Sequence, residues 1–181
     1  MSCKVTEIPY LRVAFLDFEA SSLDRDGWPI EIGLSWINSN LQIQTYASLI
    51  RPAPDWPEHA WSPVSARIHN IPRNELKSAP DASVVSTRFL KALTGRVALS
   101  DAVPFERRWL DRLFRAAGVA DRVSIEDFDG VTMSAFPSHA LDHLYERLDL
   151  TRAPHRAGPD SARLAKAWLA GLSIDMKNGD R

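Results

Sequence analysis

Cysteine is nearly absent from this sequence of 181 residues, which contains only Cys3. A single cysteine excludes an internal disulfide framework and any metal site built from several cysteines. The chain also has no apolar run long enough to span a membrane, and its opening residues MSCKVTEIPY lack the apolar region of a signal peptide. We therefore expect a cytoplasmic protein with no membrane partner.

Charge of one sign is not in excess either. The formal net charge is −1 and the sequence pI is about 6.5, so the chain lacks the basic field typical of many nucleic-acid-binding proteins. The 22 basic residues comprise 17 arginines and 5 lysines. Arginine suits bidentate phosphate contacts, but codon bias produces the same excess, so charge alone does not identify a partner.

Internal repeats, low-complexity tracts and long charge runs are missing from the chain, and nothing in it marks a domain boundary. The length suits one ordinary domain with a full hydrophobic core. Hydrophobic residues make up 45% and charged residues 25%, which is typical of a soluble globular protein. We expect a single domain over residues 1–181, and the sequence leaves the oligomeric state open, a homodimer included.

Hydrophobic patterning predicts three strands followed by alternating helices and strands. The first three strands are expected at residues 11–18, 30–38 and 41–50, with a hairpin at Ser39-Asn40. Helices are expected at residues 62–69, 73–77, 81–94, 104–117, 138–149 and 159–171, and further strands at 96–100 and 121–126. This order predicts an α/β fold with a mixed sheet between helices.

Two acidic residues close the first predicted strand, in the stretch FLDFEASSL of residues 15–23. Side chains along a strand alternate between its faces, so Asp17 and Glu19 share one side at its carboxyl end. Carboxylates this close repel one another unless one is protonated or a cation lies between them. Hard cations such as Mg²⁺ and Mn²⁺ prefer these oxygen ligands. Taken alone, however, the D-x-E motif also fits a strand end exposed to solvent.

A second polar group stands near the C-terminus, in the stretch HRAGPDSARLAKAW that starts at His155. Pro159 suits the first position of a helix, which places Asp160 in the first turn and His155 in the preceding loop. A loop histidine beside a metal-binding carboxylate can take a proton from an attacking water. Without the first motif, a capping aspartate and a surface histidine would be the simpler interpretation, because the helix dipole favours an acid there in any case.

A third group lies in LSDAVPFERRWLDRLF, residues 99–114. Glu106 shares a helix stripe with Leu110 and Leu113, so it lies at the amino-terminal edge of the buried side. Asp101 is expected in the loop just after a strand, and either acid can reach a cation held at the end of the first strand. The same helix is expected to turn three arginines to solvent: Arg108, Arg112 and Arg115.

Together, these groups resemble the motifs of the DnaQ-like 3′–5′ exonucleases of the DEDDh type, relatives of proofreading exonucleases and RNase T. DFEASSL resembles the first motif, in which a D-x-E pair binds the metals, and HRAGPD resembles the third. SLIRP followed by ARIHNIPRNEL resembles the segment between the first two motifs. The resemblance extends from Leu11 to about Trp168, and the order and spacing of the motifs make the set more specific than any one of them.

The resemblance implies a ribonuclease H-like α/β fold, a mixed sheet flanked by helices. It implies hydrolysis of phosphodiester bonds at the 3′ end of single-stranded DNA or RNA by a mechanism with two Mg²⁺ or Mn²⁺ ions, in which His155 is the general base. It also implies that Ser21, Ser22 and Leu23 bind the terminal nucleotide. The predicted catalytic residues are Asp17, Glu19, Glu106, His155 and Asp160. The four acids among them are the predicted metal ligands, with Asp101 as the alternative to Glu106.

One residue departs from the family pattern. The second motif usually carries Phe-Asp before an aromatic residue and leucine, whereas this chain reads Phe105-Glu106 before RRWL. The longer side chain reaches the cation directly or through water, or it disrupts the two-metal geometry. Two alternatives therefore stay open: a non-catalytic nucleic-acid-binding protein on an exonuclease scaffold, and a different metal-dependent reaction, such as hydrolysis of nucleotides or oligonucleotides.

Two tryptophans in a proline-rich connection, Trp56 and Trp61, are further candidates for contact with nucleic acid. Aromatic rings can stack on single-stranded bases. A tryptophan in such a connection more often covers the hydrophobic core, and we favour that interpretation here.

Overall fold

The computed structural model describes residues 12–179, so Cys3 and the predicted strand start at residue 11 lie outside the described residues. A five-stranded sheet has the order β3-β2-β1-β4-β5. Its strands are β1 (Val13–Ala20), β2 (Pro29–Ile37), β3 (Ile43–Leu49), β4 (Val97–Ser100) and β5 (Ile125–Asp127). The first three strands are antiparallel neighbours, while β1, β4 and β5 run parallel to one another. The predicted mixed sheet is confirmed.

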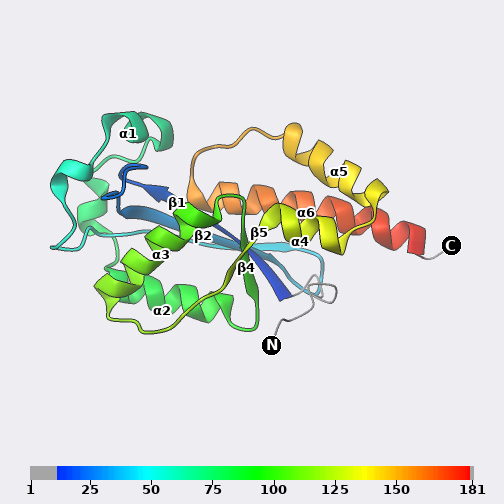
Figure 1. Ribbon diagram of the computed structural model, residues 1–181, viewed down its shortest axis with the longest axis horizontal. Coiled ribbons are helices and arrows are strands. Elements are labelled where there is room, and N and C mark those ends of the chain that lie inside the picture. Colours follow the sequence, from blue (N-terminus) through cyan, green and yellow to red (C-terminus); the bar gives the residue numbers. More distant parts are fainter. Residues whose placement is uncertain (1–11, 180–181) are drawn as a thin grey trace.

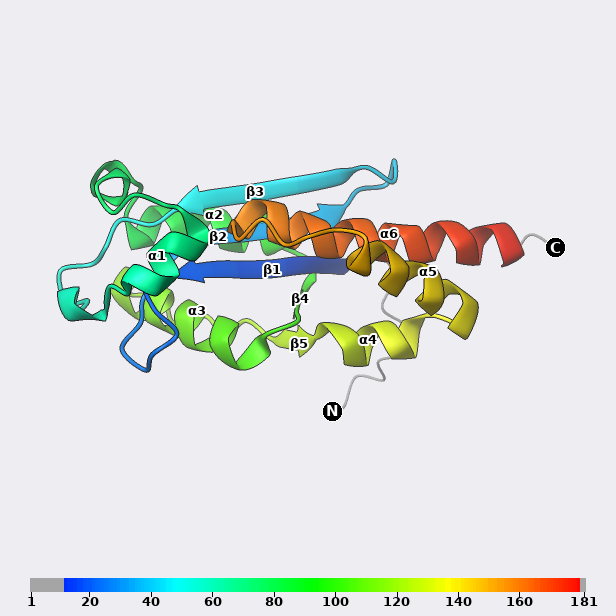
Figure 2. The ribbon, with the colours of Figure 1, turned by 90° about the horizontal axis from the view of Figure 1, so that it is seen from above.

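Around this sheet, the described residues form six α-helices and two short 3-10 helices. The α-helices are α1 (Pro63–His69), α2 (Ala82–Leu93), α3 (Val103–Ala117), α4 (Phe128–Ala135), α5 (Ser138–Asp149) and α6 (Ala157–Gly179), and the 3-10 helices are η3 (Glu58–Ala60) and η4 (Glu75–Ser78). Figure 1 shows α5 and α6 on one side of the sheet and α2 on the other. Figure 2, seen from above, shows α1 beside the arrowhead of β1.

The central strand β1 packs against helices on both faces of the sheet, because its side chains alternate between the faces and those on each face are apolar. Ala14, Leu16 and Phe18 join the cluster that α2 and α3 bury. Val13 and Phe15 join a second cluster with residues of α4, α5 and α6. This alternation continues past the apolar residues, so Asp17 and Glu19 emerge on the side of α6, as the sequence predicts.

Several parts of the chain differ from the predicted elements. The strand predicted at 121–126 is confined to Ile125–Asp127, and the helix predicted at 73–77 is the 3-10 helix Glu75–Ser78. Helix α4 was not predicted, because Gly130 and the polar residues of FDGVTMSA have low intrinsic helix propensity. Asp127 nevertheless caps it by accepting a hydrogen bond from the Gly130 amide at 2.7 Å. Helix α6 begins at Ala157 rather than residue 159 and continues to Gly179, well beyond the predicted end at 171.

The tryptophans of the proline-rich connection cover the core, as favoured above. Trp56 is buried and stacks on Trp28 with ring centroids 5.7 Å apart. Trp61 packs edge-on against His69 and lies 5.8 Å from Trp28, measured between ring centroids. Among residues 12–179, no helix is both long and apolar enough to cross a membrane.

Candidate functional site

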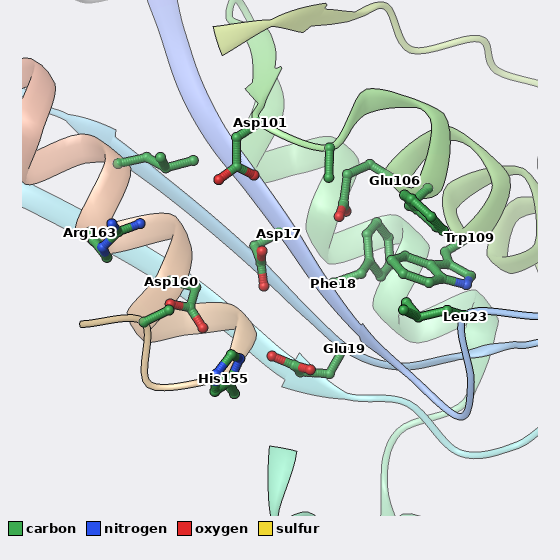
Figure 3. A pocket seen from close by; sticks show the side chains of 14 residues that line it. Asp17, Phe18, Glu19, Leu23, Asp101, Glu106, Trp109, His155, Asp160 and Arg163 are labelled. Carbon is green, nitrogen blue, oxygen red and sulfur yellow. The ribbon is translucent and has the colours of Figure 1, made fainter. Parts of the chain in front are cut away.

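Three carboxylates meet at the carboxyl end of β1. Asp17, Glu19 and Asp160 each offer an oxygen atom, and these oxygens all lie within 4.8 Å of one another. The first two come from β1, and the third comes from the first turn of α6. Figure 3 shows their carboxylates turned toward one another. The structure thus brings together two motifs that lie more than 140 residues apart in the sequence.

Contacts with β2 bring the first turn of α6 to this position. The carboxylate of Glu31 accepts a hydrogen bond from the Ala157 amide at 2.9 Å, which satisfies one of the free N–H groups of the helix N-terminus. Gly33 allows close approach, because a β-carbon there would collide with the Ala157 carbonyl. Farther along the strand, the hydroxyls of Ser35 and Ser161 form a hydrogen bond of 2.9 Å.

His155 stands in the loop before α6, as predicted, and its side chain is exposed at the cavity edge. Figure 3 shows it next to Glu19 and Asp160. Its backbone has a φ of 56°, in the left-handed region that residues other than glycine rarely adopt. Arg163 of α6 anchors the start of this loop and the end of α5 by donating hydrogen bonds to the carbonyls of Thr151 and Leu148 at 2.7 and 2.9 Å, respectively.

Glu106 enters the same cavity from α3, and Asp101 enters from the loop after β4 (Figure 3). The cavity has a volume of about 240 Å³. Glu106 is buried, with 2% of its surface exposed, and its Oε2 has no hydrogen-bond partner among the described residues. It stays outside the group of three acids whose oxygens lie within 4.8 Å of one another. Asp101 is more exposed than Glu106.

Burial raises the pKa of each acid in the cavity, and neighbouring negative charges add to the rise at Asp17, Glu19, Asp101 and Glu106. Burial, followed by the charges of Glu19 and Asp160, holds the pKa of Asp17 well above its usual value. Burial and the charges of Asp160 and Glu31 raise the pKa of Glu19 to about 8. Burial also holds the pKa of Glu106 well above its usual value, and the charge of Asp17 adds to this effect.

The two remaining acids of the cavity follow the same trend. Removal of water raises the pKa of Asp101 and of Asp160. A hydrogen bond of 2.9 Å from the Arg156 amide to Asp160 Oδ2 opposes the rise there. Without a bound cation, the cavity therefore favours the protonated form of each carboxyl group more than water does, and Glu19 keeps its proton up to a pH of about 8.

A second cavity of about 450 Å³ adjoins the first and shares part of its lining, including Glu19, Leu23 and His155. Two of the three residues predicted to bind a terminal nucleotide line it: Ser22 and Leu23. Ser21 does not, because it is buried and its Oγ accepts a hydrogen bond from the Trp28 amide at 3.0 Å. Its position indicates a structural role in closing the loop that carries Leu23.

Two of the three arginines expected in solvent make specific contacts instead. Arg108 donates a hydrogen bond to the Leu23 carbonyl at 2.9 Å, and Arg112 donates one to the Asp26 carbonyl at 2.6 Å. Both therefore hold the loop after β1 against α3. Arg115 is exposed, as predicted.

Glu31 and Arg156, which are not among the predicted site residues, form an ion pair beside the cavity. The Arg156 guanidinium donates to both carboxylate oxygens of Glu31, at 2.7 and 3.0 Å. A signal for Glu31 was present, since it is the only charged residue in the strand PIEIGLSWI. A buried charge in an apolar strand requires a partner. Its partner 125 residues later carried no comparable signal.

No protein-family model matches the chain. Among curated proteins, the 3′-5′ exonuclease DinG of Staphylococcus aureus (strain USA300) is 28% identical over 162 residues, which cover 87% of this chain and 17% of DinG. The chain therefore spans less than a fifth of the length of the curated relatives that it matches.

Solved structures of exonucleases have a similar fold. E. coli Exonuclease I in complex with a dA16 oligonucleotide has a TM-score of 0.64 and 16% identity, over 89% of this chain and 40% of that chain. A 3′-exonuclease that recognises the histone mRNA stem-loop has a TM-score of 0.65 and 17% identity, over 93% of this chain and 84% of that chain. The predicted resemblance to DnaQ-like 3′–5′ exonucleases is confirmed.

The similarity to these exonucleases also confirms the predicted fold, a ribonuclease H-like mixed sheet between helices. Another structure of E. coli Exonuclease I with single-stranded DNA is a zinc-bound form, with a TM-score of 0.61 and 14% identity, over 93% of this chain and 41% of that chain. The prediction that residues 1–181 form a single exonuclease-like domain stays a prediction; DinG is much longer than this chain.

Proposed function

We propose that the chain is a divalent-metal-dependent 3′–5′ exonuclease that hydrolyses phosphodiester bonds at the 3′ end of single-stranded DNA or RNA by a two-metal mechanism. The observation that carries the proposal is the convergence of five carboxylates on one cavity with a histidine at its edge. The 3′-5′ exonuclease named DinG and the complexes of Exonuclease I with single-stranded oligonucleotides support it.

The residues of the cavity fit Mg²⁺ or Mn²⁺. Both cations prefer hard oxygen ligands, and five acidic residues line the cavity and offer carboxylate oxygens. Asp160 Oδ1 and Glu106 Oε2 are buried without a hydrogen-bond partner among the described residues, which leaves them free to bind cations or their water. We assign one ion to Asp17, Glu19 and Asp160, and a second to Asp17 and Glu106, with Asp101 as the alternative to Glu106.

When bound, such cations neutralise charge on the scissile phosphate and make a water molecule more acidic. The contribution of the chain is to position the groups around that phosphate. His155, exposed beside Glu19 and Asp160, takes a proton from the attacking water as general base. The acidic cavity and a polyanionic substrate are compatible, because the cations reverse the local charge.

The second cavity suits the terminal nucleoside of the substrate. It is lined by apolar side chains that are largely exposed, with 66% of Leu23, 58% of Val64 and 48% of Ile68 accessible to solvent. Apolar groups can pack against a base of any sequence. The cavity shares Glu19 and His155 with the acidic one, so a nucleoside there has its phosphate near the proposed catalytic groups. We assign Ser22 and Leu23 to this contact, and Ser21 to its support.

A strand with a label on its 3′-terminal nucleotide tests the proposal. With Mg²⁺ or Mn²⁺, the purified protein should release labelled mononucleotides, and EDTA should stop the release. Metal-independent cleavage, or products of internal cuts, would contradict the mechanism. Long strands, dinucleotides and mononucleotides, compared at equal concentration, distinguish an exonuclease from an enzyme that acts on short oligonucleotides or nucleotides.

One observation favours a second candidate function. Glu106 replaces the expected aspartate and lies outside the group of three acids. A catalytically impaired protein that binds nucleic acid is the alternative, and it would bind a labelled single strand without releasing mononucleotides. The cytoplasmic location that the sequence predicts and the homodimer that it leaves open remain proposals. The site does not depend on either of them.

A further inference from the structure

One face of β2 forms a binding surface for the N-terminus of α6. Glu31, Gly33 and Ser35 alternate along the strand, so their side chains share this face. Glu31 binds the Ala157 amide, Gly33 lies against the Ala157 carbonyl, and Ser35 binds Ser161. These contacts fix where the N-terminus of α6 lies along β2 and how the first turns of the helix are oriented on the strand.

The contact at Glu31 is the strongest of the three. Its side chain is 6% exposed, and its carboxylate accepts three hydrogen bonds, two from the Arg156 guanidinium and one from the Ala157 amide. Bidentate pairs between arginine and a carboxylate fix orientation as well as distance. The backbone amide of Arg156 binds Asp160 Oδ2, so both the side chain and the backbone of Arg156 are held.

The residue before Arg156 is His155, whose left-handed backbone conformation is disfavoured for a side chain with a β-carbon. Such a conformation persists only where the surrounding structure enforces it. The hydrogen bonds at Arg156 and Ala157 hold the C-terminal side of His155, while Arg163 holds the earlier part of the loop.

We propose that Glu31 is a positioning residue for the hydrolysis, acting through Arg156 to hold His155 where it can accept the proton of the attacking water. The inference rests on the proposed exonuclease function. Glu31 itself faces the helix N-terminus and does not line the acidic cavity. Its role is therefore separate from that of the acids proposed to bind metal.

Substitution of Glu31 by glutamine tests this role with little change in volume. Glu31→Gln should lower kcat at least tenfold at saturating Mn²⁺ while KM for the substrate changes less than twofold. In a His155→Ala background, the same substitution should change the residual rate less than twofold, because it acts through the missing imidazole. Equal losses in both backgrounds would contradict the inference, as would wild-type activity in Glu31→Gln.

Arg156 sharpens the test, because 43% of its side chain is exposed and it could contact the substrate directly. Arg156→Lys keeps the charge but loses the bidentate geometry. Under the positioning role, it should lower kcat and leave KM unchanged. A loss confined to KM would make Arg156 a phosphate contact and overturn the inference.

Asp81 provides a matched control. It also binds a helix N-terminus, accepting from the Val84 amide at 3.0 Å, and it also pairs with an arginine, Arg51, at 3.2 Å. Neither it nor its partner lines the acidic cavity. Asp81→Asn should leave kcat within twofold of the wild type. If Asp81→Asn lowers kcat as much as Glu31→Gln does, both losses reflect general destabilisation, and the positioning role of Glu31 is contradicted.

Hydrogen exchange separates failure of this inference from failure of the proposed function. In Glu31→Gln, the amides of residues 155–157 should exchange at least tenfold faster than in the wild type, and in Asp81→Asn they should not. Unchanged exchange overturns the positioning role whatever the activity. Absence of activity in the wild type, or full activity in His155→Ala, would overturn the proposed function, and exchange alone would then decide whether Glu31 holds this loop.

Discussion

Two helices deliver acids to the end of β1, and their N-termini are built differently. At α6, Glu31 binds the Ala157 amide, and Asp160 itself accepts a hydrogen bond from the Arg156 amide. At α3, no side chain caps the helix. Both acids have one buried oxygen without a partner in the described part of the chain, but only Asp160 has its other oxygen held by a backbone amide of its own helix N-terminus. Asp160 is thus oriented by hydrogen bonds, whereas Glu106 is placed only by the burial of its helix.

The proposed function requires that the departure from the family pattern be tolerated at α3, and this difference supplies a physical reason. An acid held by a hydrogen-bond network has one productive length, because its partners fix where the carboxylate lies. An acid held only by packing can differ in length if a cation or its water completes its coordination. A buried carboxylate without such a partner is destabilising. We therefore expect the orientation of the Glu106 carboxylate to depend on bound metal more than that of the Asp160 carboxylate does.

The largest effect should follow substitution of the acid at the centre of the site. Asp17 contributes to the group of three acids, its pKa is raised by the charge of Glu19, and its own charge raises the pKa of Glu106. Asp17→Asn should therefore reduce mononucleotide release to assay background and weaken Mn²⁺ binding, measured by titration calorimetry. Unchanged Mn²⁺ affinity would mean that the cation binds elsewhere, and that α3 and α6 do not bring their acids to a shared metal site at Asp17.

The next prediction tests the α3 side directly. Glu106→Ala should remove most activity, whereas Glu106→Asp should retain or raise it, because the shorter side chain restores the family geometry. The wild type should work better with Mn²⁺ than with Mg²⁺, which demands stricter octahedral geometry. Rates with each metal for the two variants provide the measurement.

Asp101 provides the matched comparison for Glu106, since both acids line the same cavity. Asp101→Ala should have a smaller effect than Glu106→Ala. Full activity in Glu106→Ala together with loss in Asp101→Ala would transfer the metal-binding role to Asp101. Full activity in both would remove the second motif from the site.

His155→Ala tests the α6 side without removing a metal ligand. Loss of a general base typically lowers the rate about 10²–10⁴-fold, so kcat should fall within that range. Mn²⁺ affinity should stay close to that of the wild type, because the imidazole is assigned no metal contact. If His155→Ala and Asp17→Asn lose metal binding equally, the separation of roles is wrong.

The smallest expected effect is a dependence of stability on pH. The pKa of Glu19 is raised from 4.5 to about 8 in the folded protein, so the folded state binds more protons than the unfolded chain between these pH values. The contribution of Glu19 to the free energy of unfolding is therefore fully present below pH 4.5 and is lost as the pH rises through 8. Without metal, the Tm should decrease by roughly a few degrees across this window.

Metal should reverse this trend. Mn²⁺ binds the ionised carboxylates, so it should raise the Tm more at pH 8.5 than at pH 5.5. Calorimetric scans with EDTA and with Mn²⁺ at both pH values measure the difference. An increase in the Tm with pH in EDTA would contradict the raised pKa of Glu19.

The sequence predicted the central features of the fold because they follow local rules. Alternation along β1 placed Asp17 and Glu19 on one face, and the apolar stripe of α3 placed Glu106 at its buried edge. Pro159 indicated a helix start, although the helix begins two residues earlier. The departure occurs because Glu31 binds the Ala157 amide from another strand, and local sequence carries no information about that contact.

The parts that were missed depend on long-range partners. Arg108 and Arg112 occupy an outer stripe of α3, which suits solvent, until the loop after β1 packs beside them. The role of Glu31 depends on an arginine 125 residues later. Periodicity identifies which face a residue occupies, but the partner across that face becomes known only with the tertiary structure.

The central claim is that the acids of β1, α3 and α6 hold divalent cations together. Anomalous diffraction from crystals soaked in Mn²⁺ tests it most directly, because manganese is located independently of any assay. The account predicts one anomalous peak among the carboxylates of Asp17, Glu19 and Asp160, and a second beside Glu106. Peaks confined to other parts of the surface, with none in this cavity, would contradict it.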